Sequence, residues 1–240
     1  MTDLHTHILP GMDDGARDEE MSLQMLRMEW QQGVDTVVLT PHFYREQETA
    51  EQFLSRRAQA YDRLRARLDR LPAEEREALP RLILGAEVTF VPNLDREPGL
   101  EKLCIGQTPY MLLEMPFYPW SSRMLQKINA LIGRSGVTPV LAHIERYLPD
   151  QKKALTEELL DMGLPVQMGT ELLLGGTMAR RQGMKLLKQR KAHFVASDCH
   201  DPVRRPPNVG KAMAIVESKL GRGFFEELAA EADELVMDMG

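Results

Sequence analysis

Five of the six histidines in this chain of 240 residues stand directly after short apolar runs, and several acidic residues do the same. Imidazole and carboxylate groups together suit Mn, Fe or Zn, whereas a structural zinc site built on thiolates needs more than the two cysteines present. The residue types therefore predict a metal site. The candidate ligands are His5, His7, Asp14, His42, Glu87, Glu114, His143, Asp198 and His200.

Two pairs among these residues have the spacing i, i+2, namely His5 with His7 and Asp198 with His200. Alternate residues of a strand point to the same side, so each pair is expected to hold an ion between its two side chains. One such pair is weak evidence, but two pairs with further ligand types at strand ends form a specific signal. The sixth histidine, His193, opens an apolar run rather than ending one, so we expect it to be structural.

Short apolar runs alternate with longer amphipathic segments. The runs are typical of strands buried on both faces, and they cover 1–4, 35–40, 81–86, 110–113, 138–142, 165–168 and 192–197. Apolar residues at helical spacing cover 18–32, 49–71, 121–136, 151–162, 177–190 and 209–221. This alternation predicts parallel strands with right-handed crossovers, and seven units favour a barrel over an open sheet. Because the carboxyl ends of parallel strands open on one face, candidate ligands scattered over about 200 positions are expected to converge there.

Composition narrows the class of protein. Thirty Lys and Arg against 36 Asp and Glu give a formal net charge of −6, which disfavours a nucleic-acid coat. The longest uncharged run, 103–113, is shorter than the ~20 residues that span a bilayer, and no basic-then-apolar signal opens the sequence. Two cysteines cannot build a disulfide framework. We expect a cytoplasmic protein without membrane insertion, folded as a single domain over 1–240, and leave its oligomeric state open.

Cys199 and Arg205 have the C-x5-R spacing of cysteine-dependent phosphatases. Such a loop wraps backbone N–H groups around phosphate while a thiolate attacks. Here the intervening residues include a proline, which lacks an N–H, and no glycine. Moreover, if Asp198 and His200 face the site, Cys199 between them faces away. The match is therefore interpreted as coincidental.

The motifs as a set resemble the polymerase and histidinol phosphatase (PHP) superfamily. More narrowly, they are similar to the manganese-dependent protein-tyrosine phosphatases of bacterial capsule and exopolysaccharide loci. The resemblance runs from residue 1 to about residue 210, in order and with matching spacing. The motifs are Asp3-Leu-His-Thr-His7, Asp13-Asp14-Gly15, Pro41-His42, Gly85-Ala-Glu87, Leu113-Glu114, Ala142-His-Ile-Glu-Arg146-Tyr147, Ser197-Asp-Cys-His200 and Arg205-Pro-Pro207.

The resemblance implies an α/β fold, a distorted (β/α)7 TIM-like barrel, that holds three divalent metal ions. These ions would be Mn²⁺, with Fe or Zn as alternatives. The first ion would be bound by His5, His7, Glu87 and Asp198. The second would be bound by Glu87, Glu114 and His143, and the third by Asp14, His42 and His200. Asp3 would orient a ligand imidazole, and the catalytic arginines that grip the substrate phosphate would be Arg146 and Arg205.

The implied activity is hydrolysis of phosphotyrosine in a protein, without a covalent enzyme intermediate. By resemblance the partner would be the Tyr-rich tail of a bacterial tyrosine autokinase in capsular or exopolysaccharide biosynthesis. A tyrosyl leaving group has a pKa of about 10, so it departs more easily than an alkoxide. One departure from the family pattern is the segment Gln167-Met-Gly-Thr-Glu171, where relatives more often carry small polar residues. Glu171 at the rim would add negative charge near the pocket.

Three alternatives remain at this point. A PHP-type phosphatase of a small metabolite, such as histidinol phosphate, would use the same metal site. A metal-dependent amidohydrolase also opens with His-x-His, although it accounts for neither Asp13-Asp14-Gly15 nor Asp198-x-His200. A non-catalytic PHP domain would be missing ligands, and this sequence is missing none.

Overall fold

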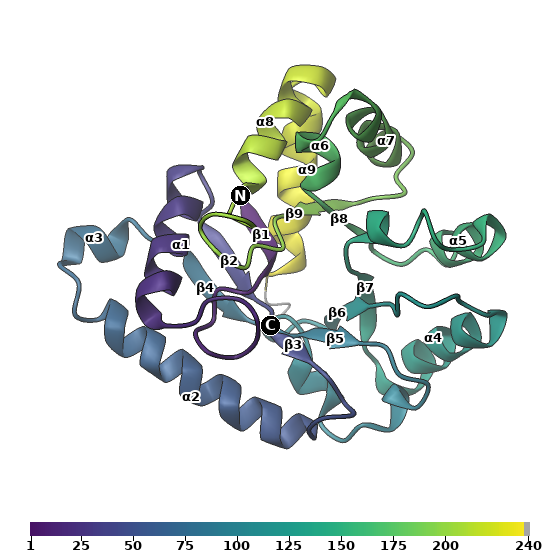
Figure 1. The fold of residues 1–240 in the computed structure, drawn as a ribbon, viewed down its shortest axis with the longest axis horizontal. Helices are drawn as coiled ribbons and strands as arrows, with labels where there is room; N and C mark the ends of the chain where they lie inside the picture. The colour runs from purple at the N-terminus through teal and green to yellow at the C-terminus, as the bar shows by residue number, and fades with distance from the viewer. Residues whose placement is uncertain (238–240) are drawn as a thin grey trace.

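Helices and strands alternate along residues 1–237, the part of the chain that this computed structural model describes, and the helices lie around a central group of strands (Figure 1). The strands are Thr2–Thr6 (β1), Thr36–Leu39 (β2), His42–Phe43 (β3), Arg81–Leu84 (β4), Glu87–Thr89 (β5), Tyr110–Glu114 (β6), Thr138–Leu141 (β7), Gln167–Gly169 (β8) and Phe194–Ala196 (β9).

The helices include nine α-helices and three short 3-10 helices within these residues. The α-helices are Glu19–Gln31 (α1), Ala50–Leu68 (α2), Ala73–Glu77 (α3), Ser122–Ser135 (α4), Lys153–Leu160 (α5), Glu171–Leu174 (α6), Thr177–Lys188 (α7), Val209–Leu220 (α8) and Arg222–Leu235 (α9). The 3-10 helices are Leu94–Arg96 (η1), Leu100–Leu103 (η2) and Ile144–Arg146 (η3). None of the helices within 1–237 is long and apolar enough to cross a membrane.

All strand pairs are parallel, and they form three sheets with the orders β1-β2-β4, β3-β5-β6-β7 and β8-β9. Two residues separate β2 from β3, and two separate β4 from β5, so these strand pairs pass from the first sheet to the second. Isolated parallel bridges join Leu141 to Val166 and Thr6 to Cys199. Neighbouring strands therefore follow the order of the chain, as the alternating pattern predicts.

The parallel α/β order is confirmed, but a closed barrel is not what the hydrogen bonds form. Within residues 1–237 the ladders make three separate sheets rather than one continuous ring. The third sheet is joined to the other two by isolated bridges. Two breaks in the strands separate the first sheet from the second, one at Thr40 and Pro41, where proline has no N–H to donate to a neighbouring strand, and one at Gly85 and Ala86. Each break immediately precedes a candidate ligand, His42 or Glu87.

A small apolar cluster lies among strands of all three sheets. It includes Leu4, Val38, Leu112, Val140 and Ala196, which come from β1, β2, β6, β7 and β9. Leu112 stands two positions before Glu114, and Ala196 two before Asp198. Alternate residues of a strand share a face, so this cluster underlies the polar groups at the strand ends. A larger cluster packs between the strands and the surrounding helices.

N-capping side chains mark the start of the two helices beside the first sheet. Asp18 caps α1 by accepting a hydrogen bond from the Met21 N–H at 2.8 Å. Thr49 and Gln52 form a capping box at the start of α2. The two helices are tied together by ion pairs, including Arg63 with Glu19 at 2.9 Å. These helices hold the chain on either side of the segment that carries His42.

Candidate metal centre

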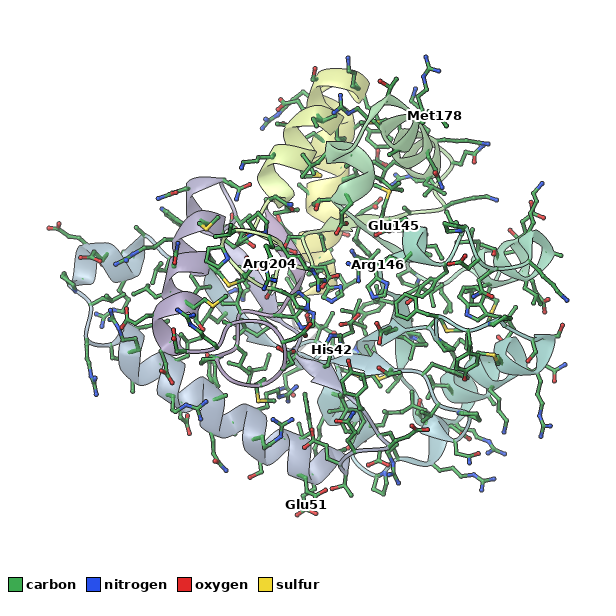
Figure 2. The ribbon with its side chains drawn as sticks, in the orientation of Figure 1. His42, Glu51, Glu145, Arg146, Met178 and Arg204 are labelled. Atoms are coloured by element: carbon green, nitrogen blue, oxygen red, sulfur yellow. The ribbon has the colours of Figure 1, made fainter. Side chains whose placement is uncertain are left out.

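All nine predicted ligands meet at the carboxyl ends of the strands. Four lie on or at the end of strands β1, β3, β5 and β6, and the other five follow β1, β7 and β9 in loops. Figure 2 shows His42 near the middle of the molecule, with Arg146 close by. Most of the nine are buried, whereas Asp14 is exposed and opens one side of the group to solvent. The structure brings these nine side chains together at one place, where the sequence predicts a metal site.

Four side chains each place one atom in a small cage. His5 Nε2 lies 3.1 Å from His7 Nε2, 3.2 Å from Glu87 Oε2 and 3.4 Å from Asp198 Oδ1. His7 Nε2 lies 3.3 Å and 3.2 Å from the same two carboxylate oxygens. Four ligands at about 2.1 Å from a tetrahedral metal ion would be about 3.4 Å apart. The cage therefore has the size that one metal ion needs.

The outer nitrogens of these imidazoles show where the lone pairs point. His7 Nδ1 lies 2.8 Å from Asp13 Oδ2, and His5 Nδ1 lies 3.3 Å from Gln167 Oε1. Both partners are oxygen acceptors, so each neutral ring carries its hydrogen on Nδ1 and turns the Nε2 lone pair into the cage. In the neutral form of both rings, which is the form that binds a metal, two lone pairs and two carboxylate oxygens face one another without a donor. Cations would relieve this arrangement, and so the donor set fits metal ions.

Glu87 connects the cage to a second group of ligands. Its Oε1 lies 2.8 Å from His143 Nε2, and its Oε2 lies 3.0 Å from His42 Nδ1. Glu114 Oε1 lies 3.5 Å from the same His143 nitrogen. Atoms of His42, Glu87 and Glu114 also lie within 4.8 Å of one another. The structure thus brings the predicted second set together and adds His42 to it.

A third group lies at the exposed edge of the site. His7, Asp14, His42 and His200 offer atoms within 4.8 Å of one another. His200 Nε2 lies 3.3 Å from Asp14 Oδ1, and His42 Nε2 lies 3.7 Å from the same oxygen. The predicted third set is therefore brought together, with His7 beside it.

Unpaired buried atoms gather at this site. Eight buried side-chain atoms within the described residues lack a hydrogen-bond partner of good geometry. Four of them belong to predicted ligands, namely His42 Nδ1, His143 Nδ1, Asp198 Oδ1 and His200 Nε2. Leaving such an atom unsatisfied costs about 1–3 kcal/mol, and folded proteins leave few. Their concentration here is typical of a site that a bound group completes.

Electrostatics keep the central carboxylates charged. Burial alone would raise the pKa of Glu87, but His5 and hydrogen bonds from neighbouring imidazoles hold it well below its usual range. Asp198 behaves in the same way, because His5 and His7 outweigh its burial and lower its pKa. Burial opposes the charged form of His143, yet its carboxylate neighbours raise its pKa to about 9. Ionised carboxylates are the form that binds a cation.

The two predicted arginines meet at one carboxylate of the cluster. Arg205 Nη2 donates to Asp198 Oδ2 at 2.7 Å, and Arg146 Nη2 donates to the same oxygen. Arg146 Nη2 also lies 3.6 Å from Glu171 Oε1, so Glu171 does stand at the rim. Both guanidinium groups are partly exposed. They are therefore held beside the cluster, and their remaining N–H groups can donate to a ligand that approaches from solvent.

Two residues at strand ends have backbone conformations that non-glycine residues seldom adopt. His143 has φ of 29° and Asp198 has φ of 50°. Such conformations cost about 1–3 kcal/mol each and persist only where surrounding structure enforces them. Both residues turn the chain out of a strand at the point where a side chain reaches the cluster. Strain at two ligand positions is typical of a functional site.

The prediction that Asp3 contacts a ligand imidazole is wrong. Asp3 touches backbone rather than an imidazole: its Oδ1 accepts from the N–H of His5 at 3.3 Å and of Ser197 at 3.1 Å. It therefore ties β1 to the segment after β9. The reason is geometric, because Asp3 lies on the side of β1 away from the cage, beside Glu29 of α1.

Asp13 and Gln167 are the residues that orient imidazoles, and sequence reasoning did not assign them this role. Asp13 also accepts from the N–H of His42 at 2.9 Å, and Gln167 Oε1 accepts from the N–H of His143 at 2.6 Å. The motif Asp13-Asp14-Gly15 predicts a ligand role for Asp14 and none for Asp13. Gln167 begins β8, and its only signal in the sequence is the departure from the family pattern.

Cys199 and His193 lie where the sequence predicts. Cys199 Sγ is fully buried, 3.8 Å from Glu29 Oε1, on the side away from the cluster. Burial and the nearby carboxyls raise the pKa of this thiol well above its usual range. His193 Nδ1 accepts a hydrogen bond from the Val166 N–H at 3.1 Å at the start of β9. Neither side chain reaches the metal centre.

Comparison with known proteins gives the family. Residues 1–238 match the family model described as capsular polysaccharide synthesis, CpsB/CapC. The chain is 30% identical to the tyrosine-protein phosphatase YwqE of Bacillus subtilis, over 98% of this chain and 91% of that protein. It is also 30% identical to the tyrosine-protein phosphatase CpsB of Streptococcus pneumoniae, over 99% of both.

A solved structure agrees with these matches. It comes from the crystal structures of YwqE from Bacillus subtilis and CpsB from Streptococcus pneumoniae, described as unique metal-dependent tyrosine phosphatases. The TM-score is 0.81 at 28% identity, and the match covers 98% of this chain and 94% of that one. From the matched motifs, the fold and these likenesses together, the chain belongs to the CpsB/CapC family of capsular polysaccharide synthesis.

Proposed function

We propose that this protein is a metal-dependent phosphatase that hydrolyses phosphotyrosine in proteins and acts in capsular or exopolysaccharide synthesis. One observation carries the proposal: lone pairs and carboxylates converge at a site whose rim holds two arginines. The relatives YwqE and CpsB are named tyrosine-protein phosphatases, and each matches this chain over nearly its whole length.

The proposed scaffold is a single domain over 1–240, a distorted (β/α)7 barrel that is interrupted where its three sheets meet. Support comes from the isolated bridges, which link Leu141 to Val166 and Thr6 to Cys199. The apolar cluster that contains Leu4, Leu112 and Ala196 supports it too, because its side chains come from all three sheets.

The proposed ligand sets are those predicted from the sequence, with Glu87 shared between two ions. Three divalent ions, Mn²⁺ or alternatively Fe or Zn, would be held by His5, His7, Asp14, His42, Glu87, Glu114, His143, Asp198 and His200. When bound, such ions supply Lewis acidity and lower the pKa of coordinated water. The protein's own part is to hold the imidazoles through Asp13 and Gln167, whose oxygens accept their outer N–H groups.

Arg146 and Arg205 are proposed to bind the phosphate. A guanidinium group presents several N–H donors in a fixed fork that matches phosphate oxygens. Asp198 engages one nitrogen of each arginine, which fixes both forks beside the cluster. Because these donors are positioned before substrate arrives, they stabilise charge that develops on the phosphoryl oxygens. A tyrosyl leaving group, with a pKa of about 10, needs little protonation to depart.

The proposed partner is the phosphotyrosine-bearing, Tyr-rich tail of a bacterial tyrosine autokinase, and the proposed location is the cytoplasm. Two cysteines without a disulfide are compatible with a reducing compartment. The family's description as capsular polysaccharide synthesis supports a partner in that process.

Substrate comparison tests the proposal. We expect the Mn²⁺-loaded protein to hydrolyse a phosphotyrosine peptide with kcat/KM at least about 100-fold above that for histidinol phosphate, a difference of about 2.7 kcal/mol in transition-state stabilisation. Preference for histidinol phosphate would instead support the small-metabolite phosphatase. Cleavage of amide substrates alone would support the amidohydrolase.

A further inference from the structure

Two partly exposed aromatic rings stack on imidazoles of the metal centre. The ring of Tyr44 lies 5.2 Å from that of His42 with 25° between their planes, and the ring of Phe117 lies 6.1 Å from that of His143 at 11°. Phe117 is 56% exposed and Tyr44 is 36% exposed. Single exposed apolar residues are ordinary on a surface, but two beside one buried polar cluster suggest a ligand that covers them.

The two rings flank the same part of the cluster. His143 and His42 contact the two oxygens of a single carboxylate, Glu87, at 2.8 Å and 3.0 Å. The aromatic rings are therefore carried on either side of Glu87. Burial and the negative charges of Glu114 and Glu87 raise the pKa of the Tyr44 hydroxyl, in agreement with a phenol that lies near these carboxylates.

The loop that carries Phe117 is fixed rather than loosely attached. The ring of Phe117 also packs against buried Tyr147, with centroids 5.5 Å apart. Just before it, the N–H of Met115 donates to the Tyr147 hydroxyl oxygen at 2.9 Å. Just after it, the indole N–H of Trp120 donates to the Pro116 carbonyl at 2.8 Å. The exposed face of Phe117 is thus held in place before a ligand binds, which reduces the entropy lost on binding.

We propose that Tyr44 and Phe117 form an aromatic wall that receives the phenyl ring of the substrate while its phosphate lies over the cluster. The inference rests on the proposed function and names the residues that select aryl over alkyl phosphates. Aromatic rings attract one another in offset or edge-to-face arrangements at centroid separations of about 4.5–7 Å. The wall adds binding energy that an alkyl phosphate, which has no ring, cannot obtain.

Binding of two phosphonates measures this effect without chemistry. Phenylphosphonate and methylphosphonate carry the same charged group, differ in the ring, and contain no ester to hydrolyse. Titration calorimetry on the Mn²⁺-loaded protein should give phenylphosphonate a Kd about tenfold lower or better. Phe117→Ala and Tyr44→Ala should each reduce this ratio about two- to tenfold and leave the Kd of methylphosphonate unchanged. Tyr44→Phe, which keeps the ring, should keep the ratio.

Tyr118 provides a matched control. It is 59% exposed and adjacent to Phe117, but its ring stacks on no imidazole of the cluster within 1–237. Tyr118→Ala should leave both Kd values unchanged, and an equal loss in this variant would overturn the proposal.

Three other results would also overturn the proposed wall. They are a wild-type ratio near one, a ratio unchanged in both alanine variants, and a parallel loss of affinity for both phosphonates. The last result would mean that the rings only support the imidazoles. Loss of the ratio in Tyr44→Phe would assign selectivity to the hydroxyl and remove Tyr44 from the wall. These readings are separate from the proposed function, which instead fails if the wild-type protein does not hydrolyse phosphotyrosine peptide.

Discussion

Two groups of buried polar side chains lie on opposite sides of β1, and they are balanced in different ways. In the metal centre, His5 and His7 turn lone pairs toward the carboxylates of Glu87 and Asp198. On the other side, the carboxyl groups of Asp3 and Glu29 contact each other beside Cys199, all three fully buried. With neutral imidazoles the first group turns no N–H toward its carboxylates, whereas the second can share a proton between two acids.

The electrostatics of the two groups differ accordingly. Burial raises the pKa of Glu29 well above its usual range, and the neighbouring Asp3 raises it further. Glu29 therefore keeps its proton, which can bridge to Asp3. Asp198 is also buried, but imidazoles pull its pKa well below the usual range. Buried acids alone therefore do not indicate a metal site. The indication is the combination of acids with imidazoles whose N–H groups are engaged elsewhere.

Metal removal is expected to have the largest effect, because it acts on the metal centre and not on the pair of acids formed by Asp3 and Glu29. We expect EDTA to abolish turnover of p-nitrophenyl phosphate and Mn²⁺ to restore it, because the cage brings together four atoms that suit a cation. The double variant His5→Ala with His7→Ala should lose one metal ion and loosen Glu87, as measured by metal analysis of the purified protein.

His193→Ala is the control for this measurement, since His193 accepts a hydrogen bond from the Val166 N–H at the start of β9, at the opposite end of the strand from the ligands. Its metal content and rate should match the wild type. Full activity in metal-free protein would contradict the assignment of the whole cluster.

The next largest effect is expected from the arginines. Arg146→Ala or Arg205→Ala should keep three metal ions and lose about 10²–10³ in kcat/KM on phosphotyrosine peptide, or about 2.7–4 kcal/mol, because each removes a positioned donor. Lysine cannot reproduce the fork, so Arg205→Lys should recover little.

Arg204 offers a matched control beside Arg205. Its side chain is 89% exposed, its one ion pair within residues 1–237 is with Asp201 at 3.7 Å, and Figure 2 labels it beside the site. Arg204→Ala should behave as wild type. Unchanged kinetics in both the Arg146 and Arg205 variants, with metals intact, would remove these arginines from the site.

Substitutions at Glu29 probe the acid pair and should change stability rather than catalysis. Glu29→Ala should lower the free energy of unfolding by about 2–4 kcal/mol, because it leaves a cavity and a buried Asp3 without its partner. Glu29→Gln keeps the shape and a donor, so its loss should stay near about 1 kcal/mol. Urea denaturation checks both values.

The pH dependence of the free energy of unfolding tests whether Glu29 is protonated in the folded state. Glu29 has a raised pKa in the folded state, so its contribution to stability is full below the unfolded value of 4.5 and is lost as pH rises toward the folded value. Glutamine does not titrate. The stability of wild type relative to Glu29→Gln should therefore fall as the pH rises above 4.5, and a difference that rises instead would contradict a protonated Glu29.

The smallest effect is expected at Cys199. Cys199→Ser keeps a donor toward Glu29 and leaves the ligands untouched, so activity should remain close to wild type and stability should change by about 1 kcal/mol or less. A folded, fully metallated but inactive serine variant would bring back the cysteine mechanism.

The strands and the converging ligands were predictable because they depend on local rules. Alternation along a strand and the common opening of parallel strand ends place His5, His7 and Asp198 without knowledge of distant contacts. Sheet closure was not predictable, because it depends on hydrogen bonds between strands far apart in the sequence. These ladders are interrupted at Thr40–Pro41 and Gly85–Ala86 and are reduced to isolated bridges beside the third sheet.

The supporting residues were harder to predict because their roles come from contacts between distant segments. Gln167 orients His5 across 162 positions, and the departure of its segment from the family pattern does not indicate that contact. Asp3 was assigned to an imidazole because of its motif, but the packing of α1 beside it turns its carboxyl to Glu29 and Ser197. Phe117 and Tyr44 show no periodic pattern that separates them from core residues.

The hydrogen bond from the Ser197 N–H to Asp3 joins residues 194 positions apart. The two chain segments that carry the cage are therefore synthesised at different times. His5 and His7 leave the ribosome long before Asp198 and His200 exist, so for most of translation the nascent chain carries only part of the cage. Closing so long a loop is slow relative to local folding. Metal loading is thus expected after the chain is released, when the metal that fills the completed site is set by the free ion concentrations around it as well as by affinity.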